Sequence, residues 1–381
     1  MNFTFKILLV LLLIYPIILS AQDSLKVLSY NIQGMKPGTN PSLRLGLIIG
    51  ELKNIDPDII GLQEINEDIN GDGSDNQGMR IKNALEEHFG TEYYYYQQQT
   101  HLSWDNQFKE FIGIISKYPV NDQGYFQLVT GVFPRKVVWN QISTPVGEIN
   151  FFNTHLSFNS ASVRLVQVEQ VDDYISATTT LTGIISNILT GDFNAIPESP
   201  VIEYLTSPSE IYYFSSFEKS NPELPGFTVP ANNPNAKIDF VFYTNKSTLS
   251  VDTSYIVMDV PLGEDMFYSD HLGIMSIFNY SNNTRIGEQL EINKKPFELS
   301  PIYPNPCYGT SSVEYEILDK TNIKISLSNL QGQELNVLVN EEKLTGSYNL
   351  KIDCNGFTEN VYLLKIEAEG VVETRKIVIM N

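Results

Sequence analysis

Apolar runs and amphipathic stretches alternate along the chain between positions 25 and 280. Short apolar runs bounded by polar turns predict strands, and apolar residues at helical spacing predict helices. Strands are predicted at 25–31, 58–64, 111–116, 137–142, 149–155, 183–190, 238–243 and 272–278, and helices at 42–52, 79–89 and 162–175. This alternation predicts a mixed, layered α/β domain over residues 23–280.

The pattern changes after position 280. Residues 281–300 are mostly polar, which predicts a linker. Beyond it, runs of alternating apolar and polar residues, such as 323–327 and 361–366, are separated by glycines and predict a small all-β sandwich over residues 301–381. This last segment holds no histidine and no obvious cluster of carboxylates, so we expect the chemistry to lie in the first domain.

The N-terminus has the pattern of an export signal. One cation precedes an almost wholly apolar stretch at 7–19, and small residues follow it. We therefore expect a signal peptide at residues 1–21, cleaved after Ala21. The apolar stretch is short for a membrane span and Pro16 interrupts it, which disfavours a retained anchor.

Composition narrows the class of protein. A chain of 381 residues with 42% hydrophobic residues can bury a substantial core. Its formal net charge of −20 disfavours tight, sequence-independent binding to a polyanion, but does not exclude a nuclease that holds its substrate through metal ions. The two cysteines, Cys307 and Cys354, could form a disulfide in an exported protein or remain buried thiols.

Six short polar segments lie at the ends of predicted strands. They are 30–32, 63–64, 153–155, 192–194, 238–240 and 269–271. In a mixed sheet the end of one strand and the start of its antiparallel neighbour meet at the same edge, so all six segments could line one cleft. Each segment alone is a weak signal, because Asp192 and Asn194, for example, also suit an ordinary turn.

The side chains in these segments suit divalent-metal chemistry. Glu64 and Asp270 offer carboxylate oxygens for Mg²⁺, and Asn31 and Asn194 offer neutral oxygen donors. Mg²⁺ held by a few carboxylates keeps positions for phosphate oxygens and offsets the charge that develops during in-line displacement.

Histidines complete the set. Two of the four histidines, His155 and His271, fall inside the six segments. A histidine can exchange protons near neutral pH, and Asp239 could orient one of them through its second ring nitrogen. Which histidine acts as acid and which as base stays open at this point.

The ordered segments YNI, LQE, NTHL, GDFN, IDF and SDHLG resemble the endonuclease/exonuclease/phosphatase superfamily, whose members include pancreatic-type deoxyribonuclease and sphingomyelinases. The resemblance implies an α/β fold, a four-layer α/β/β/α sandwich, here followed by the small all-β sandwich domain. It also implies a site at one edge, with Glu64 as the main metal ligand, assisted by Asn31 and Asp270. The implied metal is Mg²⁺, with Mn²⁺ or Ca²⁺ as alternatives.

The same resemblance implies catalytic roles. Asp192 and Asn194 would position or activate the attacking water. His155 would contact the phosphate or exchange protons, and so would His271, paired with Asp239.

Two further residues enter through the resemblance. Glu110, just before the predicted strand at 111–116, resembles the glutamate that braces His155 in the deoxyribonuclease branch. Lys237, close to Asp239 in sequence, resembles a position in bacterial members and could meet a phosphate.

The C-terminal segment resembles the sorting domain of type IX secretion through the motifs YPNP at 303–306, LQGQ at 330–333, GSYN at 346–349 and NVY at 360–362. The resemblance implies passage across the outer membrane through the type IX secretion machinery. A dedicated binding module is the alternative.

Together these features predict a secreted or surface-exposed metal-dependent phosphodiesterase that uses in-line attack by water. Nucleic acid is the first choice of substrate, because Glu110 resembles the deoxyribonuclease branch. A phospholipid or another small phosphate ester is the second choice, although no apolar hairpin built for membrane insertion supports a lipid. A catalytically dead binding protein on this scaffold is disfavoured by the complete polar set. No stable protein partner is indicated.

Overall fold

The computed structural model describes residues 24–262, 266–280, 296–300, 302–318, 320–329, 333–358, 360–368 and 371–380. The predicted signal peptide and most of the predicted linker, at 281–295, lie outside these residues. No helix within the described ranges is long and apolar enough to cross a membrane.

The first of two large sheets has the strand order β11-β12-β1-β2-β4-β3. Its strands are β1 (Ser24–Asn31), β2 (Ile59–Asp68), β3 (Tyr94–Ser103), β4 (Phe108–Ser116), β11 (Leu249–Val257) and β12 (Gly273–Tyr280). β1 runs parallel to β2 and antiparallel to β12. The carboxyl ends of β1 and β2 therefore lie beside the start of β12, at one edge of the sheet.

The second large sheet has the order β5-β6-β7-β8-β10-β9. Its strands are β5 (Val120–Gln127), β6 (Lys136–Thr144), β7 (Gly147–His155), β8 (Asn187–Asp192), β9 (Tyr213–Ser215) and β10 (Asp239–Thr244). β7 and β8 run parallel, and β8 pairs antiparallel with β10. Again two strand ends and one strand start share an edge.

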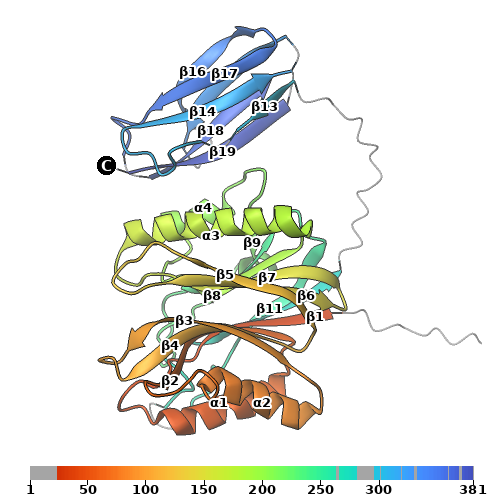
Figure 1. Ribbon diagram of the computed structural model, residues 1–381, viewed down its shortest axis with the longest axis vertical. Helices are drawn as coiled ribbons and strands as arrows, with labels where there is room; N and C mark the ends of the chain where they lie inside the picture. The colour runs from red at the N-terminus through yellow and green to blue at the C-terminus, as the bar shows by residue number, and fades with distance from the viewer. Residues whose placement is uncertain are drawn as a thin grey trace, which may run out of the picture.

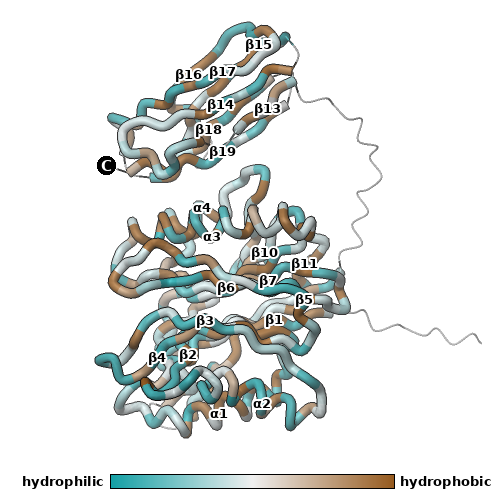
Figure 2. The backbone as a smooth tube through the Cα atoms, viewed as in Figure 1, coloured by the Kyte–Doolittle hydropathy of each residue, from teal (hydrophilic) through white to brown (hydrophobic). Residues whose placement is uncertain are grey.

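The two sheets pack face to face between two layers of helices (Figure 1). The helices are α1 (Pro41–Ile55) and α2 (Gln77–Phe89) over the first sheet, α3 (Ala161–Thr182) and α4 (Pro200–Thr206) over the second, and the short α5 (Ser216–Ser220) against β11. Hydrophobic stretches recur along the strands of both sheets (Figure 2). The predicted four-layer α/β/β/α sandwich is confirmed.

Inner strands of both sheets, such as β1 and β7, are buried on both faces because each sheet is covered twice. Val27 and Phe151 belong to the buried cluster between the sheets. Leu28, one position further along β1, faces the other way and packs with Ile48 and Leu52 of α1. Burial on both faces explains why these strands read in the sequence as continuous apolar runs.

Helix α3 is longer than the sequence predicted. It begins after Ser160, whose hydroxyl accepts a hydrogen bond from the Val163 backbone, and ends at Gly183, with φ 70°. Glycine adopts this left-handed conformation at no steric cost, which ends the helix there. The strand predicted to start at position 183 therefore starts at Asn187.

The tail sandwich, residues 296–380 as described, consists of two antiparallel sheets, which confirms the predicted all-β domain. One sheet holds β13 (Phe297–Leu299), β14 (Thr310–Ile317) and β17 (Gly346–Asp353), and the other holds β15 (Thr321–Ser328), β16 (Glu334–Lys343), β18 (Asn360–Ala368) and β19 (Val371–Ile379). A disulfide joins Cys307 to Cys354, so these residues are not free thiols.

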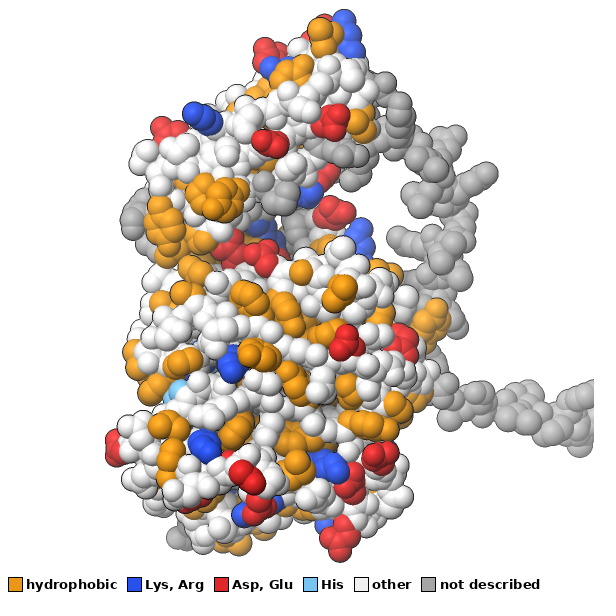
Figure 3. Space-filling view, in the orientation of Figure 1, with side chains coloured by type: hydrophobic (Ala, Val, Ile, Leu, Met, Phe, Trp, Pro, Cys, Tyr) orange, Lys and Arg blue, Asp and Glu red, His pale blue; other side chains and the backbone are white. Residues whose placement is uncertain are grey.

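The tail sandwich packs on the layer formed by α3 and α4 (Figure 1). Val361 and Val378 share a buried cluster with Val201 of α4. The Nζ atom of Lys376 lies 4.2 Å from the centroid of the Tyr204 ring. Beside these contacts, a hollow of about 630 Å³ lies between the two domains, and charged side chains meet around it (Figure 3).

Candidate active site

Three polar side chains lie on neighbouring strands of the second sheet. His155 ends β7, Asp192 ends β8 and Asp239 begins β10. The strand register places Asp192 opposite both His155 and Asp239. All three side chains are buried. Strand pairing alone therefore brings together residues that are far apart in the sequence.

The first sheet supplies the facing side of the site. Asn31 ends β1, and Glu64 lies where the pairing of β2 with β4 is irregular. His271 precedes the start of β12. Glu64 has φ 57° and Asn194 has φ 50°, a left-handed conformation that is uncommon outside glycine. Such strained positions cluster at functional sites, where the surrounding structure holds them.

The side chains of the two sheets meet at Asp192 Oδ2. Asn31 Nδ2 donates a hydrogen bond to this atom at 3.0 Å and another to Glu64 Oε1 at 3.1 Å. His155 Nε2 lies 3.5 Å and His271 Nε2 lies 3.7 Å from the same carboxylate oxygen. Burial raises the pKa of Asp192 to about 7, although the charge of His271 opposes this.

His271 and Asp239 form a buried charge pair. The His271 Nδ1 atom lies 2.9 Å from Asp239 Oδ2. Burial alone would lower the pKa of His271, but the carboxylates of Asp239 and Asp192 outweigh it and raise the pKa to about 10. His271 is therefore an imidazolium at neutral pH and presents an Nε2 proton toward Asp192.

His155, in contrast to His271, is uncharged. Arg135 Nη1 lies 3.1 Å from His155 Nδ1, and a guanidinium can only donate, so Nδ1 accepts this hydrogen bond. Burial and then Arg135 hold the pKa of His155 well below its usual range. The imidazole is neutral, with its proton on Nε2.

Glu110 reaches His155 through Arg135. Its Oε1 lies 3.3 Å from Arg135 Nη1, so the guanidinium lies between the carboxylate and the imidazole. The expectation that Glu110 itself braces His155 is corrected in this respect. Glu110 also lies within β4 and not before it. Burial and then the nearby Glu64 raise the pKa of Glu110 to about 8, although Arg135 opposes this.

Arg135 is the residue that sequence reasoning missed. It immediately precedes β6, and the pairing of β6 with β7 places Val137 opposite Thr154. A cation before a buried strand indicates a contact with His155 only once the neighbouring strand is known to end in that histidine. Arg135 is 4% exposed, so its charge acts inside the protein and not at the surface.

The comparisons with known proteins fit this geometry. Residues 28–271 match the endonuclease/exonuclease/phosphatase family. The chain belongs to this family. Members of the family are divalent-metal-dependent phosphoesterases. No curated protein matches the chain.

Solved structures of the same family share the fold. One family protein from Bacteroides thetaiotaomicron is 20% identical, with a TM-score of 0.54, and the match covers 67% of this chain and 94% of that one. A mannosyl-6-phosphatase from the same organism is 19% identical, with a TM-score of 0.54 and coverage of 67% and 99%. Truncated TDP2 from Caenorhabditis elegans is 18% identical, with a TM-score of 0.52 and coverage of 67% and 98%.

The tail sandwich also has a match. Residues 301–380 match the secretion system C-terminal sorting domain. The protein is therefore exported by type IX secretion, to the cell surface or the medium, as predicted.

The residues around Glu64 fit the divalent cation on which the family depends. Burial and then the charge of Asp270 raise the pKa of Glu64, which means that negative charge gathers here without full compensation. Carboxylate oxygens in such a setting suit Mg²⁺. Asn31 turns its Nδ2 toward Glu64 and Asp192, while its Oδ1 accepts a hydrogen bond from the Gln33 backbone.

A second group of candidate ligands lies beside the first. Potential ligand atoms of Asp192, Asp239 and His271 lie within 4.8 Å of one another. The hydrogen bond between His271 and Asp239 already occupies two of these three side chains. The chemistry of the donors therefore favours Glu64 and Asp270 as the place for a hard cation.

Cations beside the site already have partners. Lys36 Nζ lies 3.5 Å from Asp270 Oδ2. Lys237, which the sequence suggested could meet a phosphate, is 1% exposed and lies 2.7 Å from Glu218 Oε1. Burial lowers the pKa of Lys237 to about 8, and Glu218 opposes this. Lys237 therefore stabilises helix α5 through its ion pair with Glu218 instead of facing the site.

Proposed function

We propose that the protein hydrolyses small phosphate esters at the Asp192 cluster with the help of a divalent metal. One observation carries the proposal: a carboxylate whose pKa is raised to about 7, Asp192, lies against one charged and one neutral histidine. A base with a pKa near the working pH is best suited to take a proton from water. A neutral and a charged imidazole can both donate to phosphate oxygens.

Asp192 is the proposed general base. Its Oδ2 accepts the proton of the attacking water, while its Oδ1 is held by the Asn194 backbone at 2.9 Å. The Asn194 side chain donates to the Leu156 carbonyl at 3.1 Å, which leaves the Asn194 Oδ1 free among the described residues to accept from the same water. Asp192 and Asn194 therefore hold the water from two sides.

The two histidines are proposed to hold the phosphate. His155 and His271 both direct Nε2 toward the space beside Asp192, and both carry a proton on that atom. Donors placed where negative charge develops lower the barrier without reorganisation during the reaction. Asp239 keeps His271 charged, and Arg135 keeps His155 in the right tautomer.

Glu64 and Asp270 are the proposed metal ligands, with Asn31 hydrogen-bonded between Glu64 and Asp192. A bound Mg²⁺ would offset negative charge on the phosphate and on the leaving oxygen. The protein itself holds the carboxylates close together and positions the water for in-line attack on the phosphate.

Two observations support a small substrate. The net charge is −20, and the nearby cations Lys36 and Lys237 are paired with carboxylates, so a long polyanion would gain little at this edge. One of the similar structures is a mannosyl-6-phosphatase, which is named for a small phosphate ester.

Nucleic acid, the first choice from the sequence, is the second candidate. Its support is a row of rings near the site: His101 stacks on Phe133 with centroids 4.3 Å apart, and Phe158 follows at 6.0 Å. Phe158 is 55% exposed, so a base could stack on it.

The test compares purified enzyme with Mg²⁺, Mn²⁺, Ca²⁺ or EDTA on p-nitrophenyl phosphate, bis-p-nitrophenyl phosphate, plasmid DNA and sphingomyelin. We expect metal-dependent turnover of the small esters, lost in His155→Ala and His271→Ala. His88→Ala is the matched control, because His88 is exposed at the end of α2. Efficient plasmid nicking with no turnover of the small esters would favour the nuclease function over the proposed one. Full activity in EDTA would show that the reaction does not need a metal ion.

A further inference from the structure

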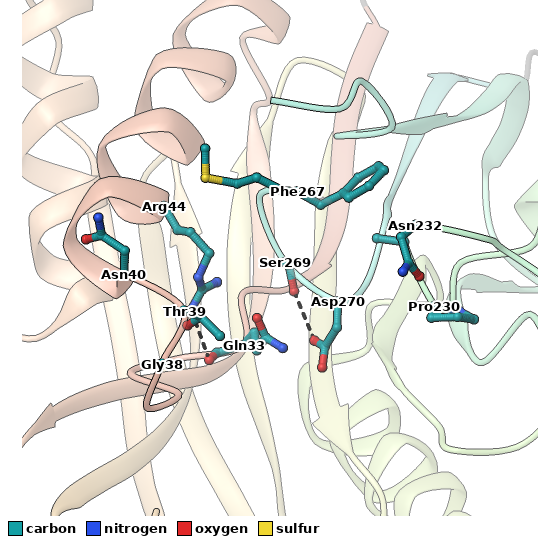
Figure 4. A pocket seen from close by; sticks show the side chains of 12 residues that line it. Gln33, Gly38, Thr39, Asn40, Arg44, Pro230, Asn232, Phe267, Ser269 and Asp270 are labelled. Carbon is teal, nitrogen blue, oxygen red and sulfur yellow. Dashed lines mark hydrogen bonds between the residues drawn. The ribbon is translucent and has the colours of Figure 1, made fainter. Parts of the chain in front are cut away.

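A pocket of about 460 Å³ is lined in part by Gln33 and Asp270. Asp270 precedes His271 in the chain and the Gln33 backbone hydrogen-bonds to Asn31, so the pocket adjoins the Asp192 cluster. Its volume falls within the range of about 300–1,000 Å³ that small-molecule sites occupy. One wall comes from the loop between β1 and α1, and the opposite wall from the loops at 230–232 and 266–270 (Figure 4). A substrate whose phosphate lies against Asp192 would extend into this pocket.

The pocket has an amide that is held in place but unused. Gln33 is 6% exposed, and its backbone adopts φ 57°. Its backbone N donates to Asn31 Oδ1 at 3.0 Å, and its carbonyl accepts from Arg44. Its side-chain amide has no hydrogen-bond partner in the described part of the chain and is directed toward Asp270 (Figure 4). An amide that has no partner within the protein can both donate to and accept from a ligand that enters the pocket.

The opposite wall offers a second amide and an apolar surface. The Asn232 side chain also lacks a hydrogen-bond partner among the described residues, and its loop is anchored because Ala231 N donates to the Asp270 carbonyl at 2.8 Å. Phe267 and Pro230 line the same side (Figure 4). The pocket therefore combines amides on two walls with an aromatic ring.

The terminal nitrogens of Arg44 and the ammonium of nearby Lys36 already have partners, whereas Arg44 Nε is buried and has none among the described residues. Arg44 donates to four backbone carbonyls, including Gly34 at 2.8 Å and Tyr268 at 2.9 Å, and so joins the two walls. Lys36 is paired with Asp270. A second phosphate placed here would meet the Asp270 carboxylate without a free cation beside it, which is unfavourable. The pocket suits a neutral group.

We propose that this pocket binds the neutral, hydroxyl-rich alcohol part of a phosphate monoester, that is, a sugar phosphate, with Gln33 as the residue that determines specificity. The sugar hydroxyls bond to Gln33 and Asn232, and its C–H face packs on Phe267. The inference rests on the proposed function. In that reaction the water oxygen joins phosphorus and its proton passes to Asp192. The P–O ester bond breaks, and the sugar oxygen leaves with the bonding electrons and takes up a proton from solvent.

The variant that tests this is Gln33→Asn. Asparagine tolerates a left-handed backbone better than most residues, so the loop is retained while the amide is withdrawn by one methylene. We compare kcat/KM for hexose 6-phosphate with that for p-nitrophenyl phosphate, which has no sugar hydroxyls. The ratio of the two is expected to fall about tenfold, the effect of one lost hydrogen bond. Gln123→Ala, at an exposed position on β5, is the matched control and should leave the ratio unchanged.

A binding measurement separates the two proposals. In the Asp192→Asn background, titration calorimetry with hexose 6-phosphate should show binding that weakens about tenfold on adding Gln33→Asn. Wild-type enzyme that hydrolyses p-nitrophenyl phosphate but ignores hexose 6-phosphate, or a ratio unaltered by Gln33→Asn, overturns the sugar pocket alone. Wild-type enzyme that hydrolyses neither ester overturns the proposed function and the pocket with it. A strong preference for a dinucleotide over the sugar phosphate also overturns the pocket.

Discussion

At the catalytic edge the buried side chains are charged, whereas in the tail sandwich they are largely apolar. Asp192, Asp239 and Arg135 are each at most 4% exposed at the edge where the two large sheets end. The tail core is a cluster of aliphatic and aromatic residues closed by the Cys307–Cys354 disulfide. The chain therefore buries charged side chains at the catalytic edge and apolar side chains in the core of the tail sandwich.

The difference follows from what each arrangement costs. Burying a carboxylate disfavours its charged form, which is why the pKa of Asp192 rises to about 7. Such a site stores free energy that the rest of the fold must offset. Apolar burial in the tail has no such cost. Substitutions at the edge should therefore affect catalysis most, and substitutions in the tail should affect stability without changing catalysis.

The largest effect is expected from Asp192→Asn. The amide cannot take a proton from water, so kcat/KM should fall by about 10³–10⁴. The raised folded pKa means that Asp192 costs stability once the pH exceeds its ordinary value and costs most above about 7. The variant should melt at the same temperature or higher at pH 8 in EDTA, measured by calorimetry. A large loss of stability with retained activity would contradict the proposal that Asp192 serves catalysis at the expense of stability.

The next effect is expected from Asp239→Asn and appears in the pH profile. Wild-type kcat/KM should rise with pH through about 7, as Asp192 loses its proton, and fall near pH 10, as His271 loses its own. Without the Asp239 charge the pKa of His271 drops, so the alkaline limb should move toward neutral pH. At pH 9 the activity should fall by about 10²-fold. An unmoved alkaline limb would show that it does not report His271.

In the tail, the double variant Cys307→Ser/Cys354→Ser should lower stability and leave catalysis unchanged. The disulfide closes a segment with a sequence separation of 47, and loss of that constraint costs about 4 kcal/mol in the chain-entropy account. Denaturant unfolding should show an earlier transition for the tail, matched by wild type under reducing conditions. The rate on p-nitrophenyl phosphate should stay within experimental error. A fall in that rate would mean that the tail supports the catalytic edge.

The smallest effect is expected where the two domains meet. Glu169 of α3 is buried beside the hollow, near Asp172, Asp173 and Lys376, and burial raises its pKa to about 8. Its neutral form is favoured in the fold, so stability is full below its ordinary pKa of 4.5 and declines as the pH rises through about 8.

Glu169→Gln should remove part of this dependence. Between pH 6 and pH 9 the wild-type melting temperature should fall by about 3 °C more than that of the variant. Glu87→Gln, at an exposed position on α2, is the control and should behave like wild type. Identical slopes in all three proteins would exclude Glu169 as the titrating group.

Much of the fold could be read from the sequence because its patterns are local. The apolar runs that became β1, β7 and β10 are buried on both faces, and that burial is visible as continuous hydrophobicity. The error at Asn187 arose because an apolar stretch after Gly183 looks the same whether it is a strand or a connection. A glycine that ends a helix can be recognised in the sequence only when the preceding helix is known to extend to it.

The chemical types at the site were determined by the sequence alone: carboxylates, amides and two imidazoles at strand ends, and a tail of alternating strands. The tertiary structure decided how they pair. Arg135 lies between Glu110 and His155, Lys237 forms an ion pair with Glu218, and the side-chain amide of Gln33 has no partner among the described residues. These outcomes depend on strand register and on which groups lose water together, and both are properties of packed sheets and not of any segment by itself.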